Sequence, residues 1–199
     1  MKLADIHRNY DTDKGTSHSY IDIYDTLFES MQNQEIVLLE IGALTCGSLK
    51  MFEHYFQTGT IYGIDNWAQT SENTVSGFRN QSYKLGDLIE DINTNHSRIK
   101  LITCDSTNTE QVNQQVGSLT FNIIIDDGDH KVESQFATYC NFIRYLEPGG
   151  IYIVEDVDKY HILQNQILNY NQTHGLKLDV ETKALFKNHR PDDVLLIIR

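Results

Sequence analysis

The sequence predicts an α/β fold with a mostly parallel sheet and helices on both faces. Short apolar runs alternate along the whole chain with segments whose apolar positions recur at helical spacing, the pattern of repeated β-α units. The chain has 199 residues, of which 40% are hydrophobic. That length suits one domain with a full core, so we expect residues 1–199 to form a single domain.

Continuous apolar runs of strand length predict the sheet. The predicted parallel strands are Glu35–Gly42, Thr60–Asp65, Arg98–Asp105, Phe121–Ile125 and Ile151–Val154. Near the end of the chain, 176–181 alternates with period two and 194–198 is an apolar run, which predicts a closing pair of strands.

Helical spacing and turn residues predict the connections. The predicted helices are Tyr20–Met31, a helix capped by Ser48 and ended by Gly59, a weak helix at 84–92, Thr109–Val116, Val132–Leu146 and 160–171. The run from Glu147 to Gly150 (EPGG) predicts a turn, and residues 1–20 are polar and rich in turn formers.

Composition excludes several functional classes. The net charge is −12, with no basic stripe, which argues against nucleic acid and against an anionic membrane surface as partners. No apolar run approaches 18 residues, and the first 15 residues show no signal pattern. The three cysteines form no CxxC pair, so we expect reduced thiols in a cytoplasmic protein without structural zinc.

Carboxylates follow two of the predicted strands at the point where each strand ends. Asp127 follows the fourth strand, and Glu155 and Asp156 follow the fifth. Ligands of open α/β sheets collect at the carboxyl ends of strands, and a set of oxygen ligands suits Mg²⁺ or Ca²⁺ better than zinc. Without a nearby Lys or Arg these carboxylates would repel one another, so they predict a bound cation or a hydrogen-bonded ligand. The alternative is that they cap helices or bind water.

His130 follows Asp127 by three residues and is predicted to begin a helix, so both side chains can face one cavity. A histidine at such a site can act as a general base near neutral pH. The alternative is a surface or capping histidine.

The turn from Glu40 to Gly47 follows the first strand. Gly42 permits a close approach of ligand and backbone, although tight βα turns need glycine in any case. The pattern is not G-x-G-x-x-G, which counts against a dinucleotide. Asp65 stands where a carboxylate can bind a ribose diol, and Asp105 and Ser106 extend that surface towards an adenine. Either aspartate could instead cap a helix or turn.

Several linked motifs resemble one family. The runs DKGTSHSYIDIYDTLF, VLLEIGALTCGSLKMFEHYF, IYGID, IIIDDGDH and LEPGGIYIVEDV, between about Asn9 and Tyr160, are similar to the S-adenosylmethionine-dependent sugar O-methyltransferases of macrolide biosynthesis, the mycinamicin and demethylmacrocin type. The resemblance implies a Rossmann-like class I methyltransferase fold. Its sheet has seven strands, mostly parallel, with an antiparallel last strand.

The resemblance also implies roles for individual residues. Asp127, Glu155 and Asp156 would hold Mg²⁺, His130 would be the catalytic base, and Asp13–Gly15 and Tyr20 would lie near the site. The cofactor-binding residues expected from it are Glu40, Gly42, Ala43, Ser48, Asp65, Asp105, Ser106 and Asp126.

Three departures from the family pattern bear on specificity. Cys46 stands where the family usually has a second glycine. Macrolide enzymes carry an extra N-terminal domain, whereas we expect this chain to start almost at the methyltransferase core. Residues 66–97 match poorly, so we expect them to be an insertion that determines acceptor specificity, and we expect 1–34 to be a helical segment that covers the site.

The sequence therefore predicts a Mg²⁺-assisted O-methyltransferase that uses S-adenosylmethionine. Its expected acceptor is a hydroxyl of a sugar, of a glycosylated molecule or of a polysaccharide-related small molecule. The expected base, His130, takes the proton of the acceptor hydroxyl. Alternatives are a catechol-like or other acidic acceptor, a nicotinamide-dependent oxidoreductase, and a silent binding domain. A homo-oligomer is compatible with the sequence.

Overall fold

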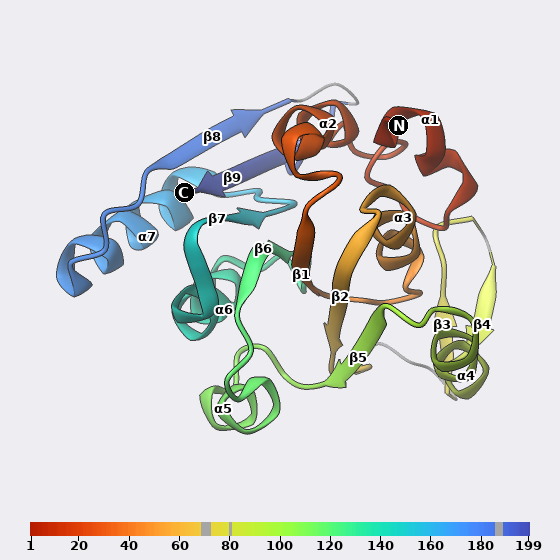
Figure 1. The fold of residues 1–199 in the computed structure, drawn as a ribbon. Coiled ribbons are helices and arrows are strands. Elements are labelled where there is room, and N and C mark those ends of the chain that lie inside the picture. Colours follow the sequence, from red (N-terminus) through yellow and green to blue (C-terminus); the bar gives the residue numbers. More distant parts are fainter. Residues whose placement is uncertain (69–72, 80, 186–188) are drawn as a thin grey trace.

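The computed structural model describes residues 1–68, 73–79, 81–185 and 189–199. A seven-stranded sheet in the order β5-β2-β1-β6-β7-β9-β8 runs through the molecule (Figure 1). The pairs β1–β2, β1–β6, β2–β5 and β6–β7 are parallel, whereas β9 is antiparallel to both β7 and β8. The predicted sheet, with its antiparallel last strand, is confirmed.

The strands fall close to the predicted runs. Their bounds are β1 Glu35–Ile41, β2 Thr58–Asp65, β5 Ile99–Thr103, β6 Phe121–Asp126, β7 Leu146–Val154, β8 Val180–Ala184 and β9 Val194–Ile198. A separate antiparallel ribbon joins β3 (Thr74–Ser76) to β4 (Ser82–Lys84).

Helices cover both faces of the sheet. They are α1 Leu3–Ile6, α2 Ile21–Phe28, α3 Gly47–Tyr55, α4 Leu85–Asn95, α5 Thr109–Val116, α6 Val132–Phe142 and α7 Tyr160–His174. Helices α1 to α4 share one buried apolar cluster with the sheet, and α5 to α7 share the other. Alternate strand residues separate these clusters: Leu38 packs on the first face and Leu39 on the second.

Some predicted elements differ in detail. The run Glu147–Gly150 lies inside β7 rather than between elements, because Phe121 pairs with Leu146 while Ile123 pairs with Ile151, so the four residues bulge out of register. Strand β8 begins at Val180 rather than at 176. The predicted helix at 132–146 ends as α6 at Phe142 and continues as a 3₁₀ turn, Ile143–Tyr145.

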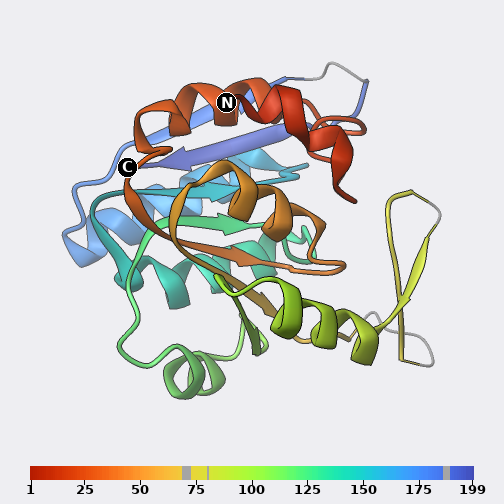
Figure 2. The ribbon, with the colours of Figure 1, turned by 45° about the vertical axis from the view of Figure 1, so that its right-hand side comes forward.

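The β3–β4 ribbon and α4 make up most of the predicted specificity insertion, 66–97. Figure 2 shows the ribbon at one side of the molecule, beyond α4. Neither strand was predicted from the sequence, because each has only three residues. Residues 69–72 and 80 of the insertion lie outside the described residues, and its role in specificity stays a prediction.

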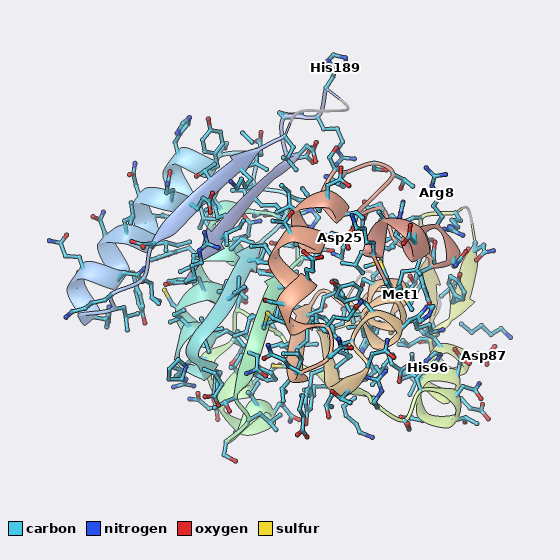
Figure 3. The ribbon with its side chains drawn as sticks, turned by 45° about the horizontal axis from the view of Figure 1, so that its top comes forward. Met1, Arg8, Asp25, Asp87, His96 and His189 are labelled. Atoms are coloured by element: carbon cyan, nitrogen blue, oxygen red, sulfur yellow. The ribbon has the colours of Figure 1, made fainter. Side chains whose placement is uncertain are left out.

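The N-terminal segment is fixed against α2. The Asp25 side chain accepts hydrogen bonds from the backbone N–H groups of Leu3 (2.6 Å) and Ala4 (3.1 Å), which satisfies open donors at the start of α1 (Figure 3, where Asp25 is labelled). The polar turns expected over residues 1–20 thus contain α1 and a 3₁₀ turn, His7–Asn9. This anchoring places residues 11–20 beside the ends of β1, β6 and β7.

Among the residues that the structure describes, no helix combines the length and the apolar character needed to cross a membrane.

Candidate active site

A cavity of about 530 Å³ opens where β1, β2, β5 and β6 end. Because the carboxyl ends of parallel strands meet at one edge of the sheet, residues far apart in sequence line the same wall. Of the predicted site residues, the lining includes Gly42, Ala43, Ser48, Asp65, Asp105, Ser106, Asp126, Asp127 and His130. Glu40, Glu155 and Asp156 lie behind this wall and are buried.

Gly42 lets two backbone segments approach at the floor of the cavity. Its φ of +92° lies in the region that favours glycine, and a Cβ there would be 1.9 Å from the carbonyl oxygen of Asp127. The N–H groups of Gly42 and Ala43 donate to the carbonyl of Ile64, at 2.8 and 3.2 Å. The turn after β1 is therefore held flat against β2 and β6, which leaves space above it.

Asp65 presents a carboxylate whose position is fixed by the backbone. It accepts hydrogen bonds from the N–H of Leu44 (2.9 Å) and the N–H of Trp67 (2.7 Å), one on each oxygen. Each oxygen keeps a further lone pair, so the carboxylate can still accept hydrogen bonds from a diol in the cavity. This geometry is compatible with the predicted role of Asp65 in binding the ribose.

At the end of β5, Asp105 caps a turn, which was the alternative to a direct role beside the adenine. One Asp105 carboxylate oxygen accepts from the N–H (2.9 Å) and hydroxyl (2.7 Å) of Thr107. The Ser106 hydroxyl lies 2.9 Å from that of Thr138. Both residues still line the cavity, so the capping role of Asp105 does not remove the segment from the site.

Asp126 is a buried acid with an unmet hydrogen bond. Its side chain is 2% exposed, and its Oδ2 has no hydrogen-bond partner in the described parts of the chain. Burial, helped by the charges of Asp127 and Asp129 and opposed by His130, raises its pKa to about 8. A buried oxygen of this kind, on the wall of a cavity, indicates a missing donor.

Ser48 does not cap α3 as the sequence predicted. The N-cap is Cys46, in a left-handed conformation with φ 60° and without a side-chain hydrogen bond to the helix. The Ser48 hydroxyl instead donates to Glu40 Oε2 at 2.5 Å. Cys46 thus adopts a conformation that a glycine takes at less cost, so a cysteine at this position carries backbone strain.

The acidic side of the site forms because β6 and β7 end in register. Asp126 pairs with Val154, so the residues after them, Asp127 and Glu155, lie side by side. Asp156 follows with φ 54°, a left-handed turn that sends its side chain in a different direction from that of Glu155. The strand ends at Val154, so the alternation of a strand no longer forces the side chains of Glu155 and Asp156 to opposite faces of the sheet.

His130 spans two of these acids. It lies in the loop before α6, with φ 59°, and not at the start of the helix. Its Nε2 is 3.1 Å from Asp127 Oδ1 and its Nδ1 is 3.5 Å from Asp156 Oδ2. Burial opposes the charged imidazolium, but these carboxylates outweigh it and raise the pKa of His130 to about 9.

Lys14 supplies a positive charge that the sequence analysis did not anticipate among the acids. Its side chain is 1% exposed, and its Nζ lies 2.6 Å from Asp127 Oδ2, 2.8 Å from both oxygens of Glu155 and 3.1 Å from Glu40 Oε1. Burial alone would lower the pKa of Lys14, but the three acids hold it well above its usual value. The expectation of an acid cluster without a basic neighbour is therefore wrong.

Charge neutralisation is uneven across the cluster. Burial opposes ionisation of Asp127, but Lys14 and His130 lower its pKa to about 2. Burial raises the pKa of Glu155, and the Lys14 ammonium only partly opposes that shift. Asp127, between the two basic groups, is therefore the carboxylate most firmly held in its charged form.

Hydroxyl and imidazole groups of the N-terminal segment complete the site. Tyr20 donates to Asp156 Oδ1 (2.5 Å), and Tyr24 donates to Glu155 Oε1. His18, which is buried, lies 3.2 Å from Asp156 Oδ1 and stacks on Tyr20. The resemblance had placed Tyr20 and the segment around Lys14 near the site, but nothing in the sequence alone indicated Tyr24 or His18.

The structure brings possible cation ligands together in adjoining groups. The ligand atoms of Asp127, His130 and Asp156 lie within 4.8 Å of one another, and so do those of Glu40, Asp127 and Glu155. Asp127 belongs to both, whereas Glu155 and Asp156 fall in different groups. The donors are mostly carboxylate oxygens, which fit a hard divalent ion.

Strand order, the antiparallel last strand and the cavity at the strand ends together define a Rossmann-like class I methyltransferase fold. Among solved structures, the chain is similar to the MycE methyltransferase of the mycinamicin pathway in complex with Mg and SAH, with a TM-score of 0.72, 21% identity, and coverage of 100% of this chain and 54% of that one. A putative rRNA-methylase from Clostridium thermocellum matches with a TM-score of 0.61, at 12% identity over 92% of this chain and 95% of that one.

Curated relatives point the same way. Demethylmacrocin O-methyltransferase of Streptomyces fradiae is 28% identical over 165 residues, 78% of this chain, and mycinamicin VI 2''-O-methyltransferase of Micromonospora griseorubida is 26% identical over 166 residues, also 78%. The chain spans 36% of the length of each of these two. No protein-family model matches the chain. The resemblance to macrolide sugar O-methyltransferases is confirmed.

Proposed function

We propose that the chain transfers a methyl group from S-adenosylmethionine to a hydroxyl, with the assistance of Mg²⁺. The acceptor is a sugar or a glycosylated or polysaccharide-related small molecule. The observation that carries the proposal is the position of His130, which lies on the cavity wall and is 3.1 Å from Asp127. A titratable imidazole thus stands between the cavity and the acidic cluster, where the reaction needs a base.

The cavity offers groups that suit several parts of the cofactor. Asp65, held by two backbone N–H groups, suits the ribose diol, and the Ser106 segment suits the adenine edge. The buried Oδ2 of Asp126, which lacks a hydrogen-bond partner, suits the ammonium group of the methionine portion, whose positive charge would favour the ionised acid. Gly42 and Ala43 leave room for the chain between these parts.

The acidic cluster suits Mg²⁺ in its donor atoms. Asp127, Glu155 and Asp156 remain the predicted ligands. When bound, the ion would supply Lewis-acid chemistry that lowers the pKa of the acceptor hydroxyl. His130 is the proposed base. Asp127 and Asp156, which contact its two ring nitrogens, raise its pKa, and a divalent ion on these carboxylates would offset that charge, so that the neutral ring could accept the proton of the hydroxyl.

The names of the relatives support a sugar acceptor, since two act on demethylmacrocin and mycinamicin VI and a third on a rhamnosyl tetracenomycin. Trp67 and the exposed Phe78, from the insertion, line the same cavity and supply an apolar wall for it. We place the reaction in the cytoplasm, where thiols stay reduced, and the three free cysteines support this.

A thermal-shift titration tests the proposal. The protein, stripped with EDTA, is melted with S-adenosylmethionine, its demethylated product or NAD, each with and without Mg²⁺. A ligand that binds only the folded state raises the melting temperature with its occupancy. We expect stabilisation by the first two ligands, a further shift with Mg²⁺, and no response to NAD.

Two variants sharpen this experiment. Asp127→Ala should lose the Mg²⁺-dependent part of the shift, and Asp87→Ala, an exposed acid on α4 labelled in Figure 3, should keep it. Each shift is measured against the melting temperature of the same variant without ligand. A response to NAD alone would contradict the proposal, and a cofactor response without any Mg²⁺ effect would remove the metal from it.

A further inference from the structure

Gln135, in α6, carries a buried amide oxygen that has no hydrogen-bond partner. The residue is 1% exposed and lines the cavity at the strand ends. Its Oε1 accepts no hydrogen bond from the described parts of the chain. A polar atom buried in this way costs free energy unless a donor reaches it. Because Gln135 belongs to the cavity wall, a ligand in the cavity can supply that donor.

The orientation of this amide is fixed by the backbone of β7. The Nε2 group of Gln135 donates a hydrogen bond to the carbonyl oxygen of Glu155 at 2.8 Å. A carbonyl oxygen can only accept hydrogen bonds, so the NH2 group of the amide must lie against Glu155 and the amide oxygen must point elsewhere. Gln135 therefore offers an acceptor, and not a donor, to a ligand.

The surface of α6 that carries Gln135 continues to the segment after β5. Gln135 and Thr138 are three residues apart, as are Thr138 and Asn141, so each pair lies side by side on the helix. The Thr138 hydroxyl lies 2.9 Å from that of Ser106, and the Asn141 Nδ2 group donates to the Ser106 carbonyl at 2.9 Å. The free oxygen of Gln135 thus belongs to the part of the wall that adjoins Ser106, where the proposed adenine lies.

Two acceptors on this wall lack partners, and they differ in charge. Asp126 Oδ2 belongs to an acid at the end of β6, whereas Gln135 Oε1 belongs to a neutral amide. S-adenosylmethionine carries N–H donors on two groups, the cationic ammonium of its methionine portion and the neutral 6-amino group of its adenine. The ammonium pairs best with the carboxylate. Amide side chains, in turn, are well suited to the 6-amino group of adenine.

We propose that Gln135 binds the adenine of S-adenosylmethionine, with its Oε1 as the acceptor for the 6-amino group. The cavity then selects adenine over a purine that carries an oxygen at position 6, because two acceptors would face each other there. The inference rests on the proposed function, since it requires that the cavity binds S-adenosylmethionine. It adds to that function a residue that distinguishes the base of the cofactor.

The test compares two ligands that differ at position 6 of the purine. They are S-adenosylhomocysteine, with an amino group there, and S-inosylhomocysteine, with an oxygen there and a proton on N1. Isothermal titration calorimetry of the full chain gives the dissociation constant of each ligand. We expect the wild type to bind S-adenosylhomocysteine about 30-fold more tightly or better. Gln135→Met, which has nearly the same size, should reduce this ratio by about fivefold or more.

The ratio separates recognition of the base from support of the fold. Gln135→Met also removes the hydrogen bond to the Glu155 carbonyl, and that loss weakens both ligands equally. Gln166→Met is the matched control, because the Oε1 of Gln166 likewise has no partner in the described parts of the chain. Gln166 lies in α7 and is not among the described residues that line the cavity, so the control should keep the ratio of the wild type.

The outcomes separate this inference from the proposed function. An unchanged ratio in a folded Gln135→Met protein, or a wild type without preference for the adenine ligand, overturns the inference while cofactor binding stands. A wild type that binds neither ligand overturns the proposed function as well. Should Gln135→Met fail to fold, a crystal structure of the wild type with S-adenosylhomocysteine decides. In that structure, a 6-amino nitrogen more than about 3.5 Å from Gln135 Oε1 overturns the inference, and a shorter distance supports it.

Discussion

Gly42→Ala tests the close approach of backbones on which the cavity depends. The added Cβ would lie 1.9 Å from the Asp127 carbonyl oxygen, and that oxygen belongs to backbone which cannot rotate away. A left-handed conformation costs a non-glycine residue about 1–2 kcal/mol, and overpacking costs about 1–3 kcal/mol more. We therefore expect the free energy of unfolding to fall by about 2–5 kcal/mol.

Urea denaturation followed by circular dichroism measures this loss. The matched control is Gly86→Ala in α4, where an added Cβ meets nothing within 4 Å. Alanine exceeds glycine in helix propensity by about 1 kcal/mol, so the control should be unchanged or slightly more stable. A Gly42→Ala protein within about 1 kcal/mol of the wild type would refute the packing argument. The variant should also lose affinity for S-adenosylmethionine, because relief of the clash must move the turn or the end of β6.

Three further substitutions test individual side chains. His130→Ala should lower turnover about 100-fold or more while the Kd for S-adenosylmethionine changes less than threefold. A comparable loss of cofactor affinity would show that His130 has a structural role. The control is His161→Ala, at an exposed histidine, which should change neither quantity. Asp65→Ala should weaken cofactor binding at least tenfold in calorimetry and also cost about 1–2 kcal/mol of stability, since the N–H groups of Leu44 and Trp67 lose their acceptor; unchanged affinity would exclude a ribose contact. Tyr24→Phe removes a buried donor to Glu155 and should lower the free energy of unfolding by about 1.5–3 kcal/mol in urea denaturation. The control, Tyr160→Phe, changes a partly buried tyrosine at the start of α7 and should lower it by less than about 1 kcal/mol. Equal losses would show that the hydrogen bond to Glu155 adds no stability.

The sheet was predictable because its signal is local. Val194–Ile198 is apolar at every position and Phe121–Ile125 at every position except Asn122, which marks strands buried on both faces, and both are strands in the structure. The short β3 and β4 carry no such run. The Glu147–Gly150 sequence does bend the chain, as predicted, but the bend is a bulge within a strand and not a turn between two elements. Turn residues show that the chain bends, but not whether the strand pairing resumes after the bend.

The cavity wall was predictable for a different reason. In a parallel sheet, residues after the strands must gather at one edge, so Gly42, Asp65 and Asp127 follow from strand ends alone. Lys14 does not, because its contact with Glu155 joins residues 141 positions apart, and the segment that carries it belongs to no strand. Tyr24 was predicted as part of a helix that covers the sheet, and that pattern cannot show that its hydroxyl reaches a buried acid.

Glu155 and Asp156 show that adjacent acids in a motif can have different protein partners. Two successive residues in a strand face opposite sides, and both could converge only after the strand had ended. The strand does end at Val154, but Asp156 then takes a left-handed conformation, and each side chain meets a different set of partners. Glu155 meets Lys14 and Tyr24 in the interior, whereas Asp156 meets Tyr20 and His130. The pair thus places one carboxylate against Lys14 in the interior and the other beside the proposed base, a difference that the order of the two residues in the sequence does not reveal.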